Sequence, residues 1–185
     1  MEGMKDVLYD PFFWAFLSAM GWAMGMLTVG STTVGRHMAY GIIGSLTAQI
    51  PRIVLPLKWV SAQPRFDPPA IVVAAGAVLC LLGLSFIFSG LGLKIYTRPT
   101  KQEPLVTTGL YSIVRHPMLL ANIIWPLGWS VICGSWIGIA LAPAWFVLVY
   151  LMSFLEEDRL IETYGADYLE YRKRVPRIIP FIKFL

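Results

Sequence analysis

The chain has few charged side chains. Of its 185 residues, 15 are Lys or Arg and 11 are Asp or Glu, whereas 57% are hydrophobic and the mean hydropathy is +0.65. Soluble globular domains usually carry about 25% charged residues. The composition therefore excludes an ordinary soluble domain and predicts an integral membrane protein.

Cysteine is also scarce. The two cysteines, Cys80 and Cys133, have no metal-ligand spacing, which excludes a disulfide framework and a thiolate metal site. No G-x-G-x-x-G motif follows a strand, so a soluble-type nucleotide-binding fold is excluded as well. The formal net charge is +4, but no basic patch with interleaved aromatics lies outside the apolar segments, so we expect no nucleic-acid partner.

Long uncharged stretches occupy much of the chain. Residues 11–35, 68–93 and 116–155 contain no Asp, Glu, Lys or Arg, and each exceeds the roughly 20 residues that a transmembrane helix needs. The third stretch is long enough for two spans, and "CGSWIG" at 133–138 predicts a tight helical hairpin. A further span is expected over 38–57.

These stretches predict an all-α integral membrane protein with about five transmembrane helices. Residues 1–93 would hold three spans, and residues 94–185 would hold the hairpin at 117–155 and a C-terminal helix. The first ten residues carry one cation against three acids and precede a long apolar run, so we expect no signal peptide.

The distribution of Lys and Arg predicts the orientation of these spans. Eleven cations fall on the side that holds the C-terminus and residues 94–115, against four on the other side, which are Lys5, Arg52, Lys58 and Arg65. The positive-inside rule therefore places the C-terminus in the cytoplasm.

The segment "GLYSIVRHPMLL" at 109–120 stands where the hairpin begins. Pro117 suits the first position of a helix. If the hairpin closes, Arg115 and His116 lie at the same membrane depth as Glu156 and Glu157, where the second arm ends. The alternative interpretation is that Arg115 snorkels to lipid phosphates and His116 caps the helix.

The C-terminal segment predicts an amphipathic helix on the membrane surface, because apolar residues recur at steps of 4, 4, 3 and 4. They are Leu160, Tyr164, Tyr168, Tyr171 and Val175. Gly165 in the middle is unexplained, since it costs about 1 kcal/mol relative to alanine. Glu156 and Glu157 point about 100° apart on a helix, and we expect Glu156 alone to face the interior.

Two segments, "EPLVTTGLYSIVRHPM" at 103–118 and "EEDRLIETYGADYLEYRKRVPRIIPF" at 156–181, resemble the isoprenylcysteine carboxyl methyltransferase family and its phospholipid-methyltransferase relatives. The resemblance covers roughly 93–185. It implies a helical membrane enzyme that uses S-adenosylmethionine at the cytoplasmic face.

The resemblance also implies the residues that contact the cofactor. They are Glu103, Pro104, Leu105, Val106, Tyr111, His116, Pro117, Met118, Leu119 and Glu156. The chemistry of these groups is suitable, since a carboxylate can bind the cofactor's ammonium, His116 with Arg115 its carboxylate, and apolar side chains its adenine. Arg115 and His116 are the candidate catalytic residues.

The methyl acceptor is expected to be a lipophilic small molecule or a lipidated substrate, and membrane lipid the surrounding partner. The resemblance implies the carboxylate of an isoprenylcysteine, but Met152 stands where the family's substrate arginine would be, so Arg115, Arg159 or another cation would have to replace it. A phospholipid amine or another lipophilic nucleophile is the alternative acceptor, with His116 as general base. A transporter or scaffold without catalysis is the alternative of another class.

Overall fold

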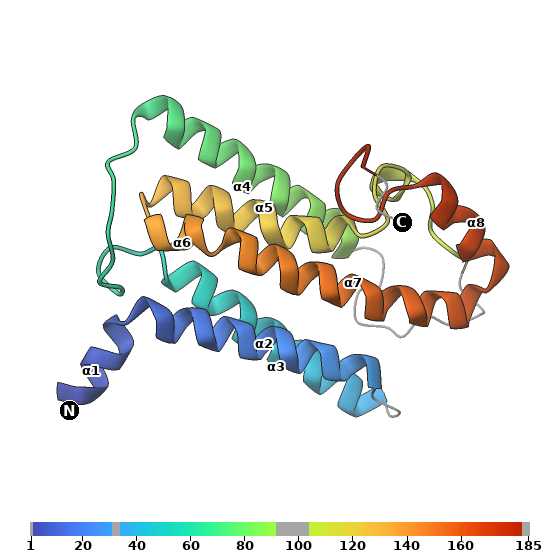
Figure 1. Ribbon diagram of the computed structural model, residues 1–185, viewed down its shortest axis with the longest axis horizontal. Coiled ribbons are helices and arrows are strands. Elements are labelled where there is room, and N and C mark those ends of the chain that lie inside the picture. The colour runs from blue at the N-terminus through green and yellow to red at the C-terminus, as the bar shows by residue number, and fades with distance from the viewer. Residues whose placement is uncertain (1, 31–33, 92–103, 183–185) are drawn as a thin grey trace.

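The computed structural model describes residues 2–30, 34–91 and 104–182, and its regular elements in these ranges are helices, as predicted. Figure 1 shows a pair of long helices, α2 and α3, beside a layer formed by α4, α5 and α7, with α8 beyond the end of α7. The helices are α1 (Glu2–Tyr9), α2 (Pro11–Gly30), α3 (Val34–Val54), α4 (Ala70–Leu91), the 3-10 helix η1 (Gly109–Ser112), α5 (Pro117–Ile132), α6 (Trp136–Ala140), α7 (Ala142–Tyr164) and α8 (Ala166–Arg174).

Two of the helical segments in the described ranges are long and apolar enough to cross a membrane. They are Ala70–Phe88 and Trp136–Tyr164, and the apolar helices Pro11–Leu27 and Pro117–Ile132 are shorter. The side chains of α4 are largely turned outward, including Ile71, Leu81 and Phe88. The number of spans and their orientation stay predictions.

The expected hairpin is confirmed, with one addition. α5 starts at Pro117, directly after His116, and ends at Ile132 before Gly134, whose φ of +63° suits a residue without a Cβ. The short helix α6 then precedes α7, and its N-cap Ser135 accepts a hydrogen bond from the Gly138 N–H at 3.0 Å. The sequence pattern did not predict α6.

Glycines bring the helices of each pair close together. A Cβ on Gly83 of α4 would lie 2.8 Å from the backbone nitrogen of Trp125 in α5, and a Cβ on Gly44 of α3 would lie 2.9 Å from the backbone nitrogen of Gly25 in α2. Small residues at these positions let the backbones approach, as in membrane helix pairs.

The prediction for the second span needs a correction. The helix α3 runs from Val34 to Val54, so it begins and ends earlier than the expected range 38–57. The positive-inside count includes Arg52, but this residue lies inside α3 and is only 3% exposed. It therefore gives no information on the orientation of the chain.

The expected single C-terminal helix is also corrected. α7 continues past Glu156 to Tyr164, and α8 begins at Ala166, with Gly165 between them at φ +55° and ψ −122°. Residues other than glycine rarely adopt this backbone conformation, so the change in direction between α7 and α8 explains Gly165. The predicted apolar residues still pack together, around buried Tyr168 and Tyr171.

Candidate active site

The segment after α8 pairs with the segment before α5. The backbone N–H of Arg115 donates to the carbonyl of Pro176 at 2.8 Å, and that of His116 donates to the carbonyl of Arg177 at 3.0 Å. Arg115 also donates from Nη1 to the carbonyls of Arg172 at 2.7 Å and Val175 at 3.1 Å. These bonds hold Arg115 and His116 against the end of the chain.

A buried carboxylate lies at the centre of the site. Glu157 of α7 is 2% exposed, and its Oε1 lies 2.6 Å from Arg115 Nη2 while its Oε2 lies 2.9 Å from Arg177 Nη2. The Nε of the partly exposed Arg172 is 3.7 Å from the same Oε2. The charge of Glu157 is thus shared by three guanidinium groups.

His116 lies between two carboxylates. Its Nδ1 is 3.0 Å from Glu156 Oε2, and its Nε2 is 3.3 Å from Glu157 Oε1. Burial lowers the pKa of His116, but the hydrogen bonds and charges of Glu156 and Glu157 outweigh burial, so the pKa lies above its ordinary value. A protonated imidazole can donate to both carboxylates at once, so the site favours the imidazolium form.

The predicted meeting of the two hairpin ends is confirmed, but the assignment of Glu156 to the interior is wrong. The side chain of Glu156 is 37% exposed, and Glu157 is the buried carboxylate. We therefore expect replacement of Glu157, rather than of Glu156, to disturb the interior of the site.

A repeated spacing on α7 explains the position of Glu157. The buried residues of this helix are Trp145, Val149, Ser153 and Glu157, which follow one another at four-residue steps. Residues four apart lie on one helix face, so this stripe was the sequence signal for Glu157. Met152 lies off this stripe and packs against the core that contains Val149.

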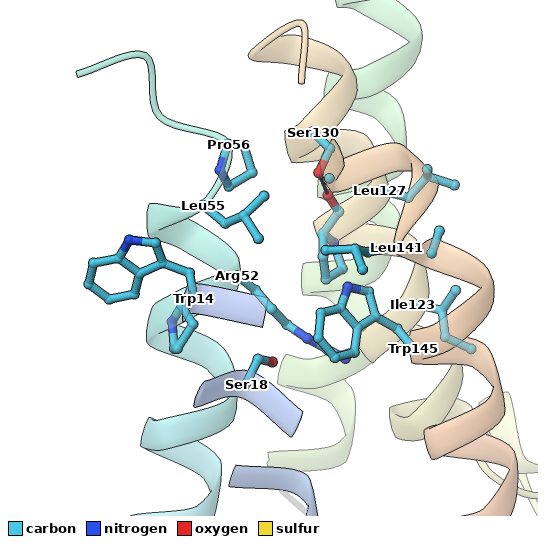
Figure 2. Close-up of a pocket in the computed structure, with 14 residues that line it drawn as sticks. Trp14, Ser18, Arg52, Leu55, Pro56, Ile123, Leu127, Ser130, Leu141 and Trp145 are labelled. Atoms are coloured by element: carbon cyan, nitrogen blue, oxygen red, sulfur yellow. Dashed lines mark hydrogen bonds between the residues drawn. The ribbon is translucent and has the colours of Figure 1, made fainter. Parts of the chain in front are cut away.

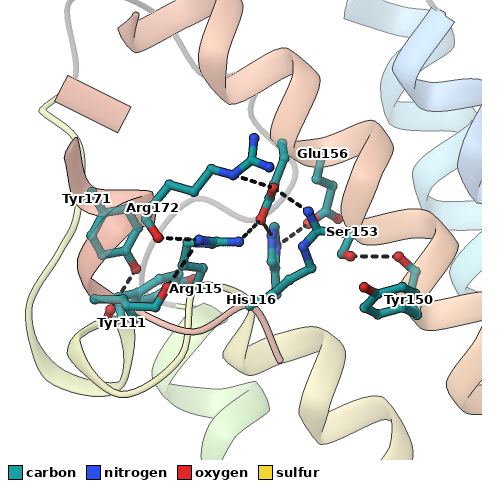
Figure 3. Close-up of polar contacts among 11 residues, drawn as sticks. Tyr111, Arg115, His116, Tyr150, Ser153, Glu156, Tyr171 and Arg172 are labelled. Atoms are coloured by element: carbon teal, nitrogen blue, oxygen red, sulfur yellow. Dashed lines mark hydrogen bonds and ion pairs between the residues drawn. The ribbon is translucent and has the colours of Figure 1, made fainter. Parts of the chain in front are cut away.

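Tyrosines close the other side of the site. The hydroxyl of Tyr171 donates to the backbone carbonyl of Tyr111 at 2.6 Å, which ties α8 to η1 (Figure 3). Burial raises the pKa of Tyr171, so its hydroxyl stays protonated and keeps this bond.

The remaining predicted residues surround this cluster at different depths. Leu105 packs against the cluster of Tyr168 and Tyr171, whereas Leu119 packs in the core with Val149. Pro104 is exposed, Val106, Tyr111 and Met118 are half-buried, and Pro117 is buried. Glu103 lies outside the described residues.

Several buried donors in the site have no hydrogen-bond partner among the described residues. They are Arg115 Nε, Arg177 Nε, Arg177 Nη1 and the Tyr168 hydroxyl. The guanidinium of Arg177 also lies 3.8 Å from the ring centroid of Phe154. Unpaired buried donors are costly, so these groups suit a ligand with several acceptor oxygens or nitrogens.

Comparison with known proteins decides the family. The phospholipid methyltransferase family model matches residues 71–167, just over half of the chain. Protein-S-isoprenylcysteine O-methyltransferase B of Arabidopsis thaliana is 30% identical over 166 residues, covering 84% of this chain and 80% of the relative. The chain belongs to the isoprenylcysteine carboxyl methyltransferase family and its phospholipid-methyltransferase relatives.

Other relatives in this family match a smaller part. Protein-S-isoprenylcysteine O-methyltransferase of Schizosaccharomyces pombe is 36% identical over 93 residues, covering 48% of this chain and 38% of the relative. The chain thus spans less than two fifths of that protein's length. A solved structure of the eukaryotic intramembrane Ras methyltransferase ICMT has a TM-score of 0.49 and 18% identity, over 92% of this chain and 76% of that chain.

The part of the chain that matches the family model contains three of the five residues of the ion cluster centred on Glu157. Arg115, His116 and Glu157 lie within residues 71–167, whereas Arg172 and Arg177 follow them. Sequence reasoning missed Arg177 because it follows α8 in an irregular segment, which has no periodicity to show which side chains turn inward.

Proposed function

We propose that this chain is an S-adenosylmethionine-dependent membrane methyltransferase that methylates a carboxylate on a lipophilic acceptor. The observation that carries the proposal is the position of His116 between Glu156 and Glu157, next to buried donors that lack partners. Family membership supports the reaction type, and the geometry of the cluster supports the class of acceptor.

The residues present fit the cofactor. Bound S-adenosylmethionine would supply a methyl group activated by its sulfonium. Glu156 is partly exposed and uses Oε2 toward His116, so the carboxylate can also bind the cofactor's ammonium. The unpartnered donors of Arg115 and Arg177 suit its carboxylate, and the apolar side chains of Leu105 and Val106 suit the adenine.

The state of His116 favours an acceptor that arrives without a proton. Both ring nitrogens face carboxylates and the pKa is raised, so His116 is poorly suited to accept a proton near neutral pH. A carboxylate acceptor needs no general base, whereas a protonated amine does. We therefore give His116 and Arg115 a positioning and electrostatic role rather than a proton-accepting one.

One observation favours a second class of acceptor, a phospholipid amine or another lipophilic nucleophile. Met152 packs in the apolar core, so no cation stands at the position where the family resemblance implies a substrate arginine. An amine acceptor has no need of that cation.

The outward-facing side chains of α4 and the cations of the C-terminal segment support a lipophilic acceptor and a multi-pass membrane protein. Ile71 and Leu81 of α4 are 77% and 67% exposed, which suits lipid contact rather than water. Four cations of the C-terminal segment lie at the end of the bundle that holds the site, which are Arg172, Lys173, Arg174 and Arg177. This charge supports a cytoplasmic location for the site.

The test is transfer of a labelled methyl group from S-adenosylmethionine by the purified protein in lipid nanodiscs. Isoprenylcysteine analogues with a free carboxylate should become labelled, and their amides should not. A panel of phospholipids with primary amines serves as the comparison. Label found only in the phospholipid amines would replace the carboxylate proposal by the second one, and no transfer to any acceptor would contradict both.

A further inference from the structure

A second polar feature lies away from the His116 site, in a cleft between the α2–α3 pair and the layer of α5 and α7. Figure 2 shows Arg52 entering this cleft from α3 and extending toward Trp145 of α7, with Ser18 of α2 below it. Leu55 and Ile123 line the cleft from opposite sides. An arginine is thus placed among mostly apolar walls inside the bundle.

The guanidinium of Arg52 is enclosed by aromatic rings. It lies 5.1 Å from the ring centroid of Trp22 and 4.8 Å from that of Trp145, within the range of cation–π contact. Its Nη1 donates to the backbone carbonyl of Asn122 at 2.7 Å. No acidic side chain among the described residues pairs with Arg52, so its charge is left without a counter-ion.

One edge of this guanidinium has no partner. Nε and Nη2 of Arg52 are buried and make no hydrogen bond within the described residues. These two nitrogens share the edge whose parallel N–H groups bind a carboxylate or phosphate with two hydrogen bonds. Because Nη1 already has a partner, the unused donors match an oxyanion in number and in direction.

We propose that Arg52 binds the anionic group of a membrane amphiphile, a carboxylate or a phosphate that carries an alkyl chain. An oxyanion would supply the missing counter-ion and two acceptors, and no other class of ligand group supplies both. This site does not depend on methyl transfer.

The surroundings favour an amphiphile over a small anion from water. The walls of the cleft include Leu55, Ile123 and Leu141, and the cleft is narrow, so the chain of a ligand must extend outward along the helices. Ile50 and Ile53, which flank Arg52 on α3, are about half exposed and suit contact with alkyl chains. Because α3 covers most of the expected second span, a lipid in the bilayer would reach this position without crossing water.

The site is separate from the ion cluster at His116. Asn122, whose carbonyl binds Arg52, follows His116 by six residues on α5, which is about 9 Å along a helix axis. Occupation of the Arg52 site can therefore be measured without the cofactor, so failure of this proposal and failure of the methyltransferase proposal are distinguishable.

The test uses the purified full chain in a neutral detergent, with binding measured by native mass spectrometry and by the shift in Tm. The probes are palmitate, hexadecyl phosphate, hexadecanol and inorganic phosphate. Palmitate or hexadecyl phosphate should bind saturably and raise the Tm, and hexadecanol should bind at least about tenfold more weakly, because it offers no charged acceptor. This comparison needs no variant.

Variants then assign the site to Arg52. Arg52→Lys keeps the charge but loses the two-donor edge, so it should bind the anionic amphiphiles at least about tenfold more weakly. Lys58→Gln, which removes an exposed cation near the end of α3, should bind like the wild type. Equal affinity for palmitate and hexadecanol, unchanged affinity in Arg52→Lys, or equally tight binding of inorganic phosphate alone would each overturn the proposal.

Discussion

Replacement of Glu157 tests whether the ion cluster holds the site together. Glu157→Gln keeps the shape of the side chain but removes the charge that faces Arg115 Nη2 at 2.6 Å and Arg177 Nη2 at 2.9 Å. The oxygen of the new amide can still accept from one guanidinium, but its NH2 group is a donor and faces the donors of the other guanidinium. At least one guanidinium, 4% or 2% exposed, therefore loses its partner.

The size of the effect follows from burial. Removal of one partner from a buried ion pair costs about 3–5 kcal/mol, because the remaining charge stays desolvated. For a chain of this length, 1 kcal/mol corresponds to about 2–4 °C in Tm. We therefore expect the Tm of Glu157→Gln to fall by about 6–20 °C, measured by nanoscale fluorimetry of the detergent-purified protein at pH 7.

Glu170→Gln is the matched control. Glu170 also faces two cations, Lys173 and Arg174, each at 3.8 Å, but its side chain is 60% exposed. Exposed pairs contribute about 0–1 kcal/mol, so the Tm should change by a few degrees at most. If Glu157→Gln lowers the Tm no more than Glu170→Gln does, the claim that the cluster stabilises the fold is refuted.

Three further predictions concern the same end of the bundle. Because the pKa of His116 is higher in the folded than in the unfolded protein, protonated His116 stabilises the fold at pH values below the ordinary histidine pKa, and this stabilisation is lost as the pH rises through the folded pKa. The Tm of the wild type should therefore fall from pH 6 upward, and the Tm of His116→Gln should change less. Glu156→Ala should abolish binding of S-adenosylmethionine in calorimetry and should lower the Tm less than Glu157→Gln does, because Glu156 is 37% exposed and faces only His116; unchanged affinity would remove Glu156 from the cofactor site. Gly165→Ala should cost about 1–3 kcal/mol in unfolding free energy because its φ is +55°. Gly25 lies inside α2, and a Cβ there would meet no atom of a neighbouring element within 4 Å, so Gly25→Ala should be neutral or stabilising by up to about 1 kcal/mol. Similar losses in both variants would contradict the backbone argument.

The helical hairpin and the proximity of its two ends could be predicted from the sequence. A charge-free stretch of 40 residues with a turn in its middle returns the chain to the same depth, so hydropathy predicted that Arg115 and His116 lie near the level of Glu156 and Glu157. The contacts of His116 with both carboxylates are seen only in the structure. Pro117 as the start of α5 followed from the fixed φ of proline. These features depend on local patterns, which a single sequence contains.

Features that depend on long-range packing were not predictable in the same way. The partner of Glu157 in the C-terminal segment, Arg177, is set by a chain reversal after α8, and the burial of Arg52 is set by the meeting of α3 with Trp145. Hydropathy does not show whether a charged residue in an apolar helix is buried, so the positive-inside count wrongly includes Arg52. The burial of Glu157 itself could have been read from the four-residue steps on α7.

The pairing of Arg115 with the segment after α8 has a consequence for biosynthesis. Arg115 is translated 60 residues before Val175, whose carbonyl it binds, and the carboxylate of Glu157 also follows it by more than 40 residues. The guanidinium of Arg115 therefore has none of these partners until the end of α7 has been made, and it lacks the carbonyl partners until α8 is complete. The site can thus be completed only after the segment that follows α8 has been synthesised.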